Sequence, residues 1–291
     1  VYKRQALSRL FRCPLVFEVR DIWPAAAVSA GQLRADGRAF QLGRRLETYM
    51  YRCADHITCV ARPMRDYLTQ YTKKPVTVVY NGIGNDAARE AEEREPQRPN
   101  NSPKTLLYAG NLGHVQQLDL LLRAVHELSD EPKFADWQVQ LLGAGAQRAK
   151  LQELSAELAL QERVRFLDAV PRDEAASLMA QADVLYLQLM HDETMGRTIP
   201  SKLFDYLVAA RPILAGLTGE GGEIAASTGA NVVFPPGDLE GLKSGLRTVV
   251  DQLPALNDQA SRNRQLVLEK FTRRQASQVL REVFQSCVKP V

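Results

Sequence analysis

Short apolar runs alternate with helical patterns along this chain, and the first of these runs has the character of a buried strand. Residues 15–19, Leu-Val-Phe-Glu-Val, are β-branched and aromatic, which is typical of a strand inside a parallel sheet. Further strands are expected at residues 57–60 and 76–80, with helices near residues 37–53 and 63–69. Because a buried parallel strand needs neighbours on both sides, we expect part of this sheet to precede residue 15.

A second alternating series begins near residue 105 and continues almost to the end of the chain. Its helical patterns lie between its apolar runs, and this alternation predicts an α/β fold with a doubly wound parallel sheet. The expected strands are residues 105–109, 137–142, 164–167, 184–189, 212–215 and 231–234. A last helix is expected at about residues 273–286.

A polar stretch separates the two series. Residues 85–103 are rich in Glu, Arg, Asn and Pro and poor in apolar residues, a composition typical of a linker. The sequence therefore predicts two Rossmann-like domains, an incomplete one over residues 6–84 and a second over residues 104–270. We expect residues 271–291 to form a helix that packs back toward the first domain.

The first five residues have an origin of their own. Val-Tyr-Lys-Arg-Gln is also the translation of an end sequence of adapters used in DNA sequencing. We interpret residues 1–5 as a scar outside the fold and expect the natural sequence to start near Ala6, part-way through a domain. The chain as it stands is therefore expected to be inactive, or nearly so.

The composition excludes several classes of protein. The 291 residues are 45% hydrophobic and 24% charged, as in a globular protein. No apolar run approaches the ~20 residues that span a bilayer. Four cysteines without a CxxC pair indicate reduced thiols in a cytoplasmic protein. Four scattered histidines lack the spacing of metal ligands, so we expect neither a metal nor another cofactor.

Charge is unevenly distributed along the chain. Residues 1–90 carry 15 Lys and Arg against 8 Asp and Glu, a net charge of +7, whereas the remainder carries 22 against 26, or −4. A basic first segment suits a phosphate-rich partner such as an anionic membrane surface, and a solvated Arg-rich helical face is the alternative. No run of Lys and Arg is interleaved with aromatic residues, so we expect no nucleic-acid partner.

Residues 200–212, Pro-Ser-Lys-Leu-Phe-Asp-Tyr-Leu-Val-Ala-Ala-Arg-Pro, carry the most informative chemistry. Pro200 suits the first turn of a helix and Ser201 can cap it. Lys202 follows at a point where exposed amides and the helix dipole already favour an anion. Asp205 lies one turn further on, where a carboxylate can bind a sugar hydroxyl. Together these residues predict a pocket for a nucleotide sugar.

This run resembles the donor-site helix of retaining glycosyltransferases of family 4. The likeness is to the branch that has P-S-K, a hydrophobic residue, an aromatic residue, an acid and Tyr before a turn ending in proline. The resemblance implies the GT-B architecture of two Rossmann-like domains, of which the first is incomplete here. Ala210 stands where this branch usually has glycine. An ordinary capped helix in an α/β domain is the alternative that the run alone leaves open.

Turns that follow the strands of the second series supply further candidates for donor binding. Glycines directly after a strand let the backbone approach a ligand, and the helix behind them offers amides to a diphosphate. The resemblance places such turns beside the nucleotide. The residues concerned are Gly110, Asn111, Gly113, Gln116, Gly143, Gly145 and Val170. Because many family members have Arg and Lys where this chain has Asn111 and Gln116, we expect Lys202 to neutralise most of the diphosphate charge.

The catalytic pattern departs from that of the family. Family 4 enzymes usually carry two glutamates eight residues apart across the donor helix; Asp205 matches the second, but Arg197 occupies the first position. Arg20 and Asp21 stand where the family often has His-Asp. We expect Arg20 to contact the acceptor or a phosphate and Asp21 to accept a proton from the acceptor hydroxyl. A turn-forming role is the alternative for Asp21.

The resemblance implies sugar transfer with retention, from a nucleotide diphosphate to a lipid-linked or polysaccharide acceptor, at the cytoplasmic face of a bacterial membrane. Lys202 would stabilise the leaving diphosphate, and Asp205 would orient hydroxyls of the donor. The alternatives are a GT-B nucleotide-sugar epimerase and a non-catalytic nucleotide-binding scaffold, the latter suggested by Arg197. An oxidoreductase is disfavoured because Arg148 replaces the third glycine of the dinucleotide fingerprint.

Overall fold

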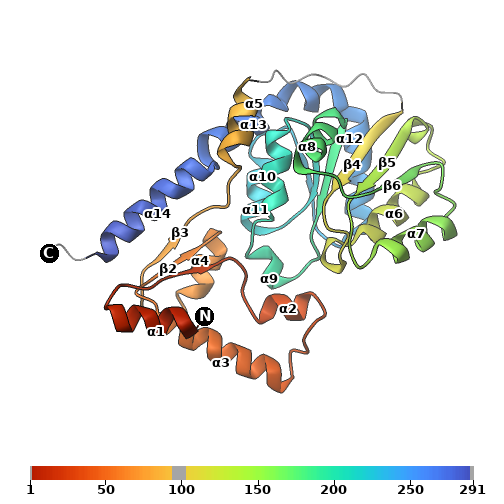
Figure 1. Ribbon diagram of the computed structural model, residues 1–291. Coiled ribbons are helices and arrows are strands. Elements are labelled where there is room, and N and C mark those ends of the chain that lie inside the picture. The colour runs from red at the N-terminus through yellow and green to blue at the C-terminus, as the bar shows by residue number, and fades with distance from the viewer. Residues whose placement is uncertain (1, 94–102, 289–291) are drawn as a thin grey trace.

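The computed structural model describes residues 2–93 and 103–288, and it contains two parallel sheets (Figure 1). The N-terminal sheet has the order β1-β2-β3, with β1 at Val16–Val19, β2 at His56–Cys59 and β3 at Val76–Val78. Four helices belong to this part: α1 (Tyr2–Phe11), α2 (Ala25–Ser29), α3 (Arg38–Cys53) and α4 (Arg62–Leu68).

The run that we expected to be buried on both sides is an edge strand among the described residues. β1 pairs with β2 alone and leaves Glu18 exposed, whereas β2 lies between two strands and is buried along its whole length. The expectation that a further part of this sheet precedes residue 15 is not tested by this edge position and stays a prediction. Both β1 (VFEV) and β2 (HITC) mix apolar with polar residues, so composition alone does not distinguish an edge from a centre.

Helix α1 was not expected from the sequence. Residues 2–5 form the first turn of α1, and Gln5 is buried and directs its amide at the sulfur of Met50 at 2.9 Å. These residues are therefore part of the fold, and excluding them from it was wrong. Their origin remains a prediction.

The second sheet has six parallel strands in the order β6-β5-β4-β7-β8-β9. Its strands are β4 (Lys104–Ala109), β5 (Trp137–Leu142), β6 (Val164–Leu167), β7 (Val184–Gln188), β8 (Ile213–Gly216) and β9 (Val232–Phe234). The expected bounds agree with these to within one residue at each end, and the doubly wound α/β fold is confirmed. The chain enters at β4, runs outward to β6 and returns to β7, so the switch point of the sheet lies between β4 and β7.

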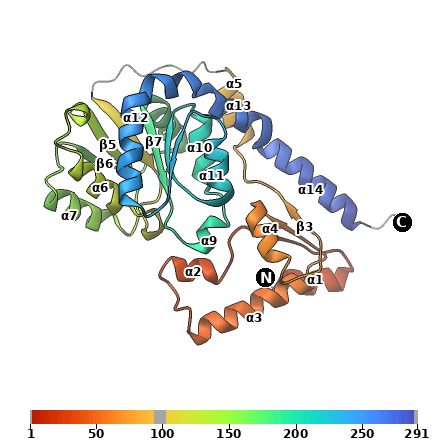
Figure 2. The same cartoon turned by 180° about the vertical axis from the view of Figure 1, so that it is seen from behind.

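Helices cover both faces of the second sheet (Figures 1 and 2). Along β4, Leu106 and Tyr108 point to one hydrophobic cluster and Leu107 and Ala109 to the other, as strand periodicity requires. The remaining helices of this part are α6 (Leu118–Glu127), α7 (Arg148–Glu157), α8 (Arg172–Gln181), α9 (Glu193–Gly196), α10 (Ser201–Val208), α11 (Gly219–Ala226), α12 (Leu239–Gln259), α13 (Ser261–Lys270) and α14 (Arg273–Cys287), with short 3₁₀ turns at His114–Gln116 and Pro132–Phe134.

The two parts share one of these clusters. It runs from Ile57 and Met64 in the N-terminal part to Leu203 and Phe271 in the second. The backbone of Ile83 also forms a bridge with Thr272, at the point where α14 begins. From there α14 extends on the side of the molecule that carries the N-terminal sheet (Figure 1).

The predicted linker contains a helix. Residues 85–93 form α5 (Asn85–Glu93), which is amphipathic despite its polar composition, and residues 94–102 lie outside the described residues. Within the described ranges, no helix is both long enough and apolar enough to cross a bilayer.

Candidate functional site

A pocket of about 540 Å³ opens at the carboxyl ends of β4 and β5, beside the switch point of the second sheet. Ligands of doubly wound sheets bind at this place, and the volume suits a small molecule. The turns after β4, β5 and β6 contribute to its lining, together with α5, α8 and α10. Six of the residues predicted for donor binding line it: Gly110, Asn111, Gly143, Val170, Lys202 and Asp205.

Lys202 is the central cation of this pocket. It lies in the first turn of α10, and its Nζ donates a hydrogen bond to the Tyr108 hydroxyl while lying 4.3 Å from the centre of that ring. No carboxylate of the described residues comes within ion-pair distance of it. Burial lowers the pKa of Lys202 to about 8, because the ammonium has lost much of its hydration. An anionic ligand would therefore meet a cation without a counterion.

Glycine is required at the two turns that face Lys202. Gly110 has φ +142°, and a side chain there would collide with the Lys202 amine. Gly143 has φ +136°, and a side chain there would collide with the Gly110 carbonyl. Both positions thus combine a backbone conformation that favours glycine with a close approach of other groups.

Other predicted residues build the turns without lining the pocket. Gln116 accepts a hydrogen bond from the Gly113 backbone N–H at 3.1 Å and so closes the turn after β4. Gly145 lies against the backbone of Leu112, where a side chain would not fit. The structure therefore gives Gly113, Gln116 and Gly145 a role in shaping the loop, and their contact with a donor stays a prediction.

The start of α10 differs from the expected cap. Pro200 occupies the N-cap position and Ser201 is the first helical residue, and no side chain caps this end. The prediction that Ser201 caps the helix is therefore wrong, and neither residue lines the pocket. The open amides at this end nevertheless lie next to Lys202, which is the arrangement that suits an anion.

Asp205 lies one turn below Lys202 and has a partner that the sequence did not reveal. Arg172, the first residue of α8, donates a hydrogen bond from Nη2 to Asp205 Oδ1 at 3.1 Å, and both residues line the pocket. Burial raises the pKa of Asp205, and the Arg172 guanidinium opposes this increase. The ion pair favours the charged form of this carboxylate, which lines the pocket.

Arg148 explains why the dinucleotide fingerprint fails. Its guanidinium donates hydrogen bonds to the carbonyls of Gly143 at 2.6 Å and Leu167 at 3.0 Å, and it pairs with Asp168 at 2.8 Å. Arg148 thus adds side-chain bonds between the turns after β5 and β6, which are also joined by the Gly143 N–H to the Leu167 carbonyl, and a glycine at this position would remove the side-chain bonds.

The predicted residues of the first part lie away from the pocket. Arg20 donates a hydrogen bond to Asn81 and pairs with Glu18 at 3.7 Å, and Asp21 accepts a hydrogen bond from the Trp23 backbone through its own carbonyl. Neither Arg20 nor Asp21 lines the pocket. Their roles toward an acceptor stay predictions.

Arg197 does not enter the pocket either. It caps the end of α9 and stacks its guanidinium on the Tyr67 ring of α4, 4.6 Å from the ring centre. Asp192, at the start of α9, accepts a hydrogen bond from Ser29 of α2 at 2.8 Å. The segment around α9 therefore connects the two parts of the chain.

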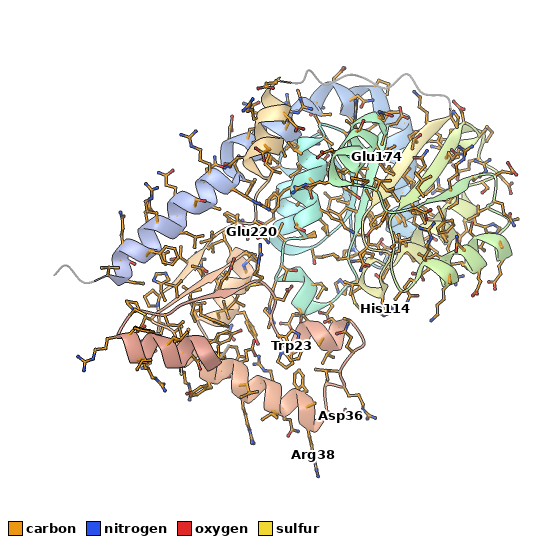
Figure 3. The ribbon with its side chains drawn as sticks, in the orientation of Figure 1. Trp23, Asp36, Arg38, His114, Glu174 and Glu220 are labelled. Carbon is orange, nitrogen blue, oxygen red and sulfur yellow. The ribbon has the colours of Figure 1, made fainter. Side chains whose placement is uncertain are left out.

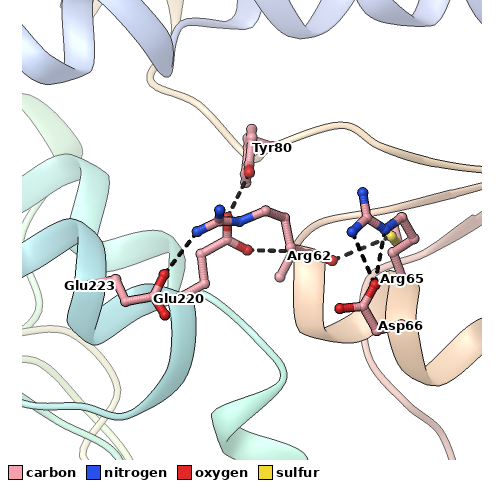
Figure 4. Close-up of polar contacts among 8 residues, drawn as sticks. Arg62, Arg65, Asp66, Tyr80, Glu220 and Glu223 are labelled. Carbon is pink, nitrogen blue, oxygen red and sulfur yellow. Dashed lines mark hydrogen bonds and ion pairs between the residues drawn. The ribbon is translucent and has the colours of Figure 1, made fainter.

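A buried carboxylate connects the two parts through hydrogen bonds and an ion pair (Figure 4). Glu220, in the first turn of α11, is 3% exposed and accepts hydrogen bonds from the backbone N–H and the side chain of Arg62 and from the Tyr80 hydroxyl, the last at 2.6 Å. Arg62 is the first residue of α4, whose own N-cap has no side-chain acceptor. Glu220 thus caps a helix of the other part. Figure 3 shows its position between the two parts, far from the tip of α3 where Arg38 lies.

The described part of the chain contains no group of three or more His, Cys, Asp or Glu residues that could hold a metal ion. The polar residues that line the pocket include Lys202, the Asp205–Arg172 pair, Asn111, Glu90 and Arg264, and the open amides at the start of α10 lie next to Lys202.

Two parallel α/β parts, with a pocket at the switch point of the second, define the GT-B fold of glycosyltransferases. HepE of Anabaena in complex with UDP has this fold with a TM-score of 0.74, at 16% identity over 97% of this chain and 75% of that one. WaaG, a glycosyltransferase involved in lipopolysaccharide biosynthesis, has a TM-score of 0.67 at 18% identity, covering 88% of this chain and 71% of that one. The chain belongs to the family described as Glycosyl transferases group 1, which matches residues 89–266. Residues 2–86 match the description Glycosyltransferase Family 4.

Curated relatives agree with this assignment. A probable glycosyltransferase of Pseudomonas aeruginosa, WbjE, is 28% identical over 77% of this chain and 56% of its own length. A putative colanic acid biosynthesis glycosyl transferase of Escherichia coli, WcaI, is 24% identical over 91% of this chain and 66% of its own length. The 2-deoxystreptamine glucosyltransferase of Streptomyces kanamyceticus is 25% identical over 68% of this chain and 51% of its own length. The chain thus spans about half the length of WbjE and of this glucosyltransferase.

Proposed function

We propose that this chain carries the donor site of a glycosyltransferase that transfers a sugar from a nucleotide diphosphate with retention of configuration. One observation carries the proposal: the Lys202 amine lies over Gly110 at the open end of α10, with no carboxylate of the described residues paired to it, and Asp205 lines the same pocket one turn further on. A cation beside free amides suits a diphosphate, and a carboxylate suits the hydroxyls of a ribose or a sugar.

The leaving group determines what the pocket must do. As the bond to the sugar breaks, negative charge develops on the departing diphosphate while the sugar becomes cationic. Lys202 and the α10 amides would stabilise that charge, and they would do so more strongly in a pocket that excludes water. The same groups would serve in place of a metal, in line with the expectation that none is needed.

UDP is the first nucleotide to consider. HepE has been solved with UDP and with UDP-glucose, and its fold covers almost all of this chain. As the sugar of the donor we propose a hexose or an N-acetylhexosamine. Val170 and its neighbours after β6 would lie beside the base, where main-chain groups can recognise it.

The proposed acceptor is a lipid-linked sugar or a growing polysaccharide at the cytoplasmic face of a membrane. The support is the colanic acid and lipopolysaccharide context of WcaI and WaaG. The surface of α1 and α3 adds to it, because large apolar side chains and basic side chains are both exposed there, as on helices that lie on anionic membranes. The apolar residues are Leu7, Leu10, Phe11, Leu42, Leu46 and Tyr49, and the basic ones are Arg9, Arg12, Arg38, Arg45 and Arg52.

Titration calorimetry of the 291-residue chain with UDP and with GDP tests the donor site. We expect saturable binding of one of them, a loss of more than tenfold in affinity for Lys202→Met, and a loss of only two- to threefold for Asn111→Ala, because charge-assisted hydrogen bonds contribute more than neutral ones. Equal losses for the two variants would show that the charge is not concentrated at Lys202. An absence of binding to both nucleotides would contradict the proposed site.

The same titration with Asp205→Asn separates the two ends of the pocket. Loss of the carboxylate should weaken UDP or GDP binding about tenfold, because a charged acceptor for a ribose hydroxyl is removed. Binding of inorganic pyrophosphate should not weaken, since it has no hydroxyl for Asp205 to bind. A parallel loss for pyrophosphate would show that Asp205 supports the phosphate end instead.

A non-catalytic nucleotide-binding scaffold is the second candidate function. Arg197 favours it, because it replaces the first acid of the family pattern and stacks on Tyr67 instead of lining the pocket. Hydrolysis of the bound nucleotide sugar distinguishes the two functions. Slow release of UDP from UDP-glucose would support the transferase, and tight binding without any release would support the scaffold.

A further inference from the structure

Tyr108 connects the two elements that surround the proposed phosphate site. It is the penultimate residue of β4 and is fully buried. Its hydroxyl donates a hydrogen bond to the Asn111 carbonyl at 2.7 Å and accepts one from the Lys202 amine. One oxygen atom therefore ties the first turn of α10 to the turn that follows β4.

We propose that Tyr108 is a positioning residue for the diphosphate: its hydroxyl holds the Lys202 amine over Gly110 and fixes the turn at Asn111 in the same contact. This inference rests on the proposed donor site, and it adds a residue that neither the motif of α10 nor the glycine turns contain. The hydroxyl reaches a bound phosphate through Lys202, so Tyr108 acts on the ligand indirectly.

The hydrophobic core does not need this hydroxyl. The ring of Tyr108 packs in the cluster with Leu106 and Leu141, and a phenylalanine would fill the same space. A buried hydroxyl costs free energy unless it is hydrogen-bonded, and here both of its bonds go to elements of the pocket. The ring face also attracts the ammonium, which adds a cation–π contact to the hydrogen bond.

The hydroxyl should also influence the protonation of Lys202. A hydrogen bond from the ammonium to the hydroxyl favours the charged amine, and burial of the Tyr108 hydroxyl raises its own pKa, so that it stays neutral. The other charged groups that line the pocket are Glu90 from α5, Arg172 from α8, Asp205 from α10 and Arg264 from α13. Removal of the hydroxyl would leave these groups in place and take away the acceptor that Lys202 uses.

Tyr206 provides a matched control. Its hydroxyl accepts a hydrogen bond from the Ala109 backbone N–H at 2.7 Å and donates one to the Ala109 carbonyl at 3.2 Å. It therefore joins α10 to β4 with the same number of bonds as Tyr108, but neither bond involves Lys202. Either substitution would weaken the attachment of α10 to β4, whereas only Tyr108→Phe would change the position and the pKa of the Lys202 amine.

The test is calorimetric titration with inorganic pyrophosphate and with UDP between pH 6.5 and 9.5, on the wild type, Tyr108→Phe and Tyr206→Phe. In the wild type, affinity should fall as the pH rises through the range in which Lys202 loses its proton. Tyr108→Phe should bind pyrophosphate about five- to tenfold more weakly at pH 7, and its decline should begin at lower pH. Tyr206→Phe should keep the wild-type pH profile even where it unfolds at a lower temperature.

A second measurement follows Lys202 directly. The resonance of ¹³C-labelled lysine Cε reports the titration of the amine, with Lys202→Met to assign the signal. A lower pKa in Tyr108→Phe than in Tyr206→Phe supports the inference. Identical titrations and pyrophosphate affinities in these two variants overturn it while leaving the donor site intact. If the wild type binds neither pyrophosphate nor a nucleotide, the donor site itself is wrong and this inference falls with it.

Discussion

The pocket and the contact between the two parts both hold a buried charge, but they satisfy it in opposite ways. Glu220 is surrounded by donors, with the backbone and guanidinium of Arg62 and the hydroxyl of Tyr80 all within hydrogen-bond distance. The Lys202 amine contacts the hydroxyl and the ring of Tyr108, but among the described residues it has no carboxylate partner. A charge that is satisfied inside the protein holds the fold together, whereas a cation without a counterion is available to an anionic ligand.

The largest effect is expected at the contact between the parts. Glu220→Ala removes the cap of α4 and leaves the Tyr80 hydroxyl without its acceptor, so we expect it to lower the free energy of unfolding by about 3 kcal/mol. Urea denaturation at pH 7 measures this. Glu223 is the matched control, because it pairs with the same Arg62 at 2.8 Å but is 67% exposed. Similar losses for Glu220→Ala and Glu223→Ala would show that burial does not distinguish the two carboxylates.

In the pocket, removal of the buried charge should raise the free energy of unfolding instead of lowering it. Lys202 is buried as a charge, and its pKa is lowered from 10.5 to about 8, so the folded state holds its proton less tightly than the unfolded chain does. Lys202→Met keeps the length of the side chain and removes the charge, and it should raise the free energy of unfolding at pH 7 by about 1 to 3 kcal/mol while weakening diphosphate binding.

The pH dependence fixes the sign of this prediction. Below pH 8 the amine is charged in both states and the full cost of burying it is present. Between pH 8 and 10.5 the unfolded chain binds more protons than the folded one, so the stability of the wild type rises relative to that of the variant. The advantage of Lys202→Met should therefore shrink in urea denaturation as the pH increases. An advantage that stays constant up to pH 10.5 would mean that it arises from packing and not from charge.

How far the sequence predicts the pocket and the contact between the two parts depends on how far apart in the chain the contacting residues lie. The strands of the second sheet and the chemistry of Lys202 and Asp205 follow from local patterns, because apolar runs and a helix start are visible within a few residues. The partners of these side chains do not follow from local patterns. Tyr108 lies 94 positions from Lys202, and Arg172 lies 33 positions from Asp205. In the sequence, Tyr108 is one more aromatic residue in a buried strand, and its hydroxyl acquires a role only from the packing of α10 against β4.

The contact between the parts was less predictable still. The segment around Glu220 is rich in glycine and carries no motif for such a contact, and its partner Arg62 is 158 positions away. Helix α5 was missed because its composition is polar, and α1 was missed because its first residues were interpreted as lying outside the fold. The exposed flank of β1 shows the same limit, since an edge strand and a central strand use the same residue types.

The smallest effect is expected at Ala210, which belongs to neither region and so tests whether stability and binding can be changed separately. The residue follows α10 with φ +54°, in the left-handed conformation that glycine adopts without strain, and the resemblance to family 4 places glycine at this position. Ala210→Gly relieves about 1 to 2 kcal/mol of backbone strain, but it adds freedom to the unfolded chain and removes a buried methyl group. We therefore expect a net gain of about 0.5 kcal/mol in urea denaturation. Pyrophosphate affinity should not change, because Ala210 lies beyond the far end of α10 from Lys202. A weakened affinity would instead show that the end of α10 transmits strain to the pocket. Stability at Ala210 and binding at Lys202 would then not be independent along this helix.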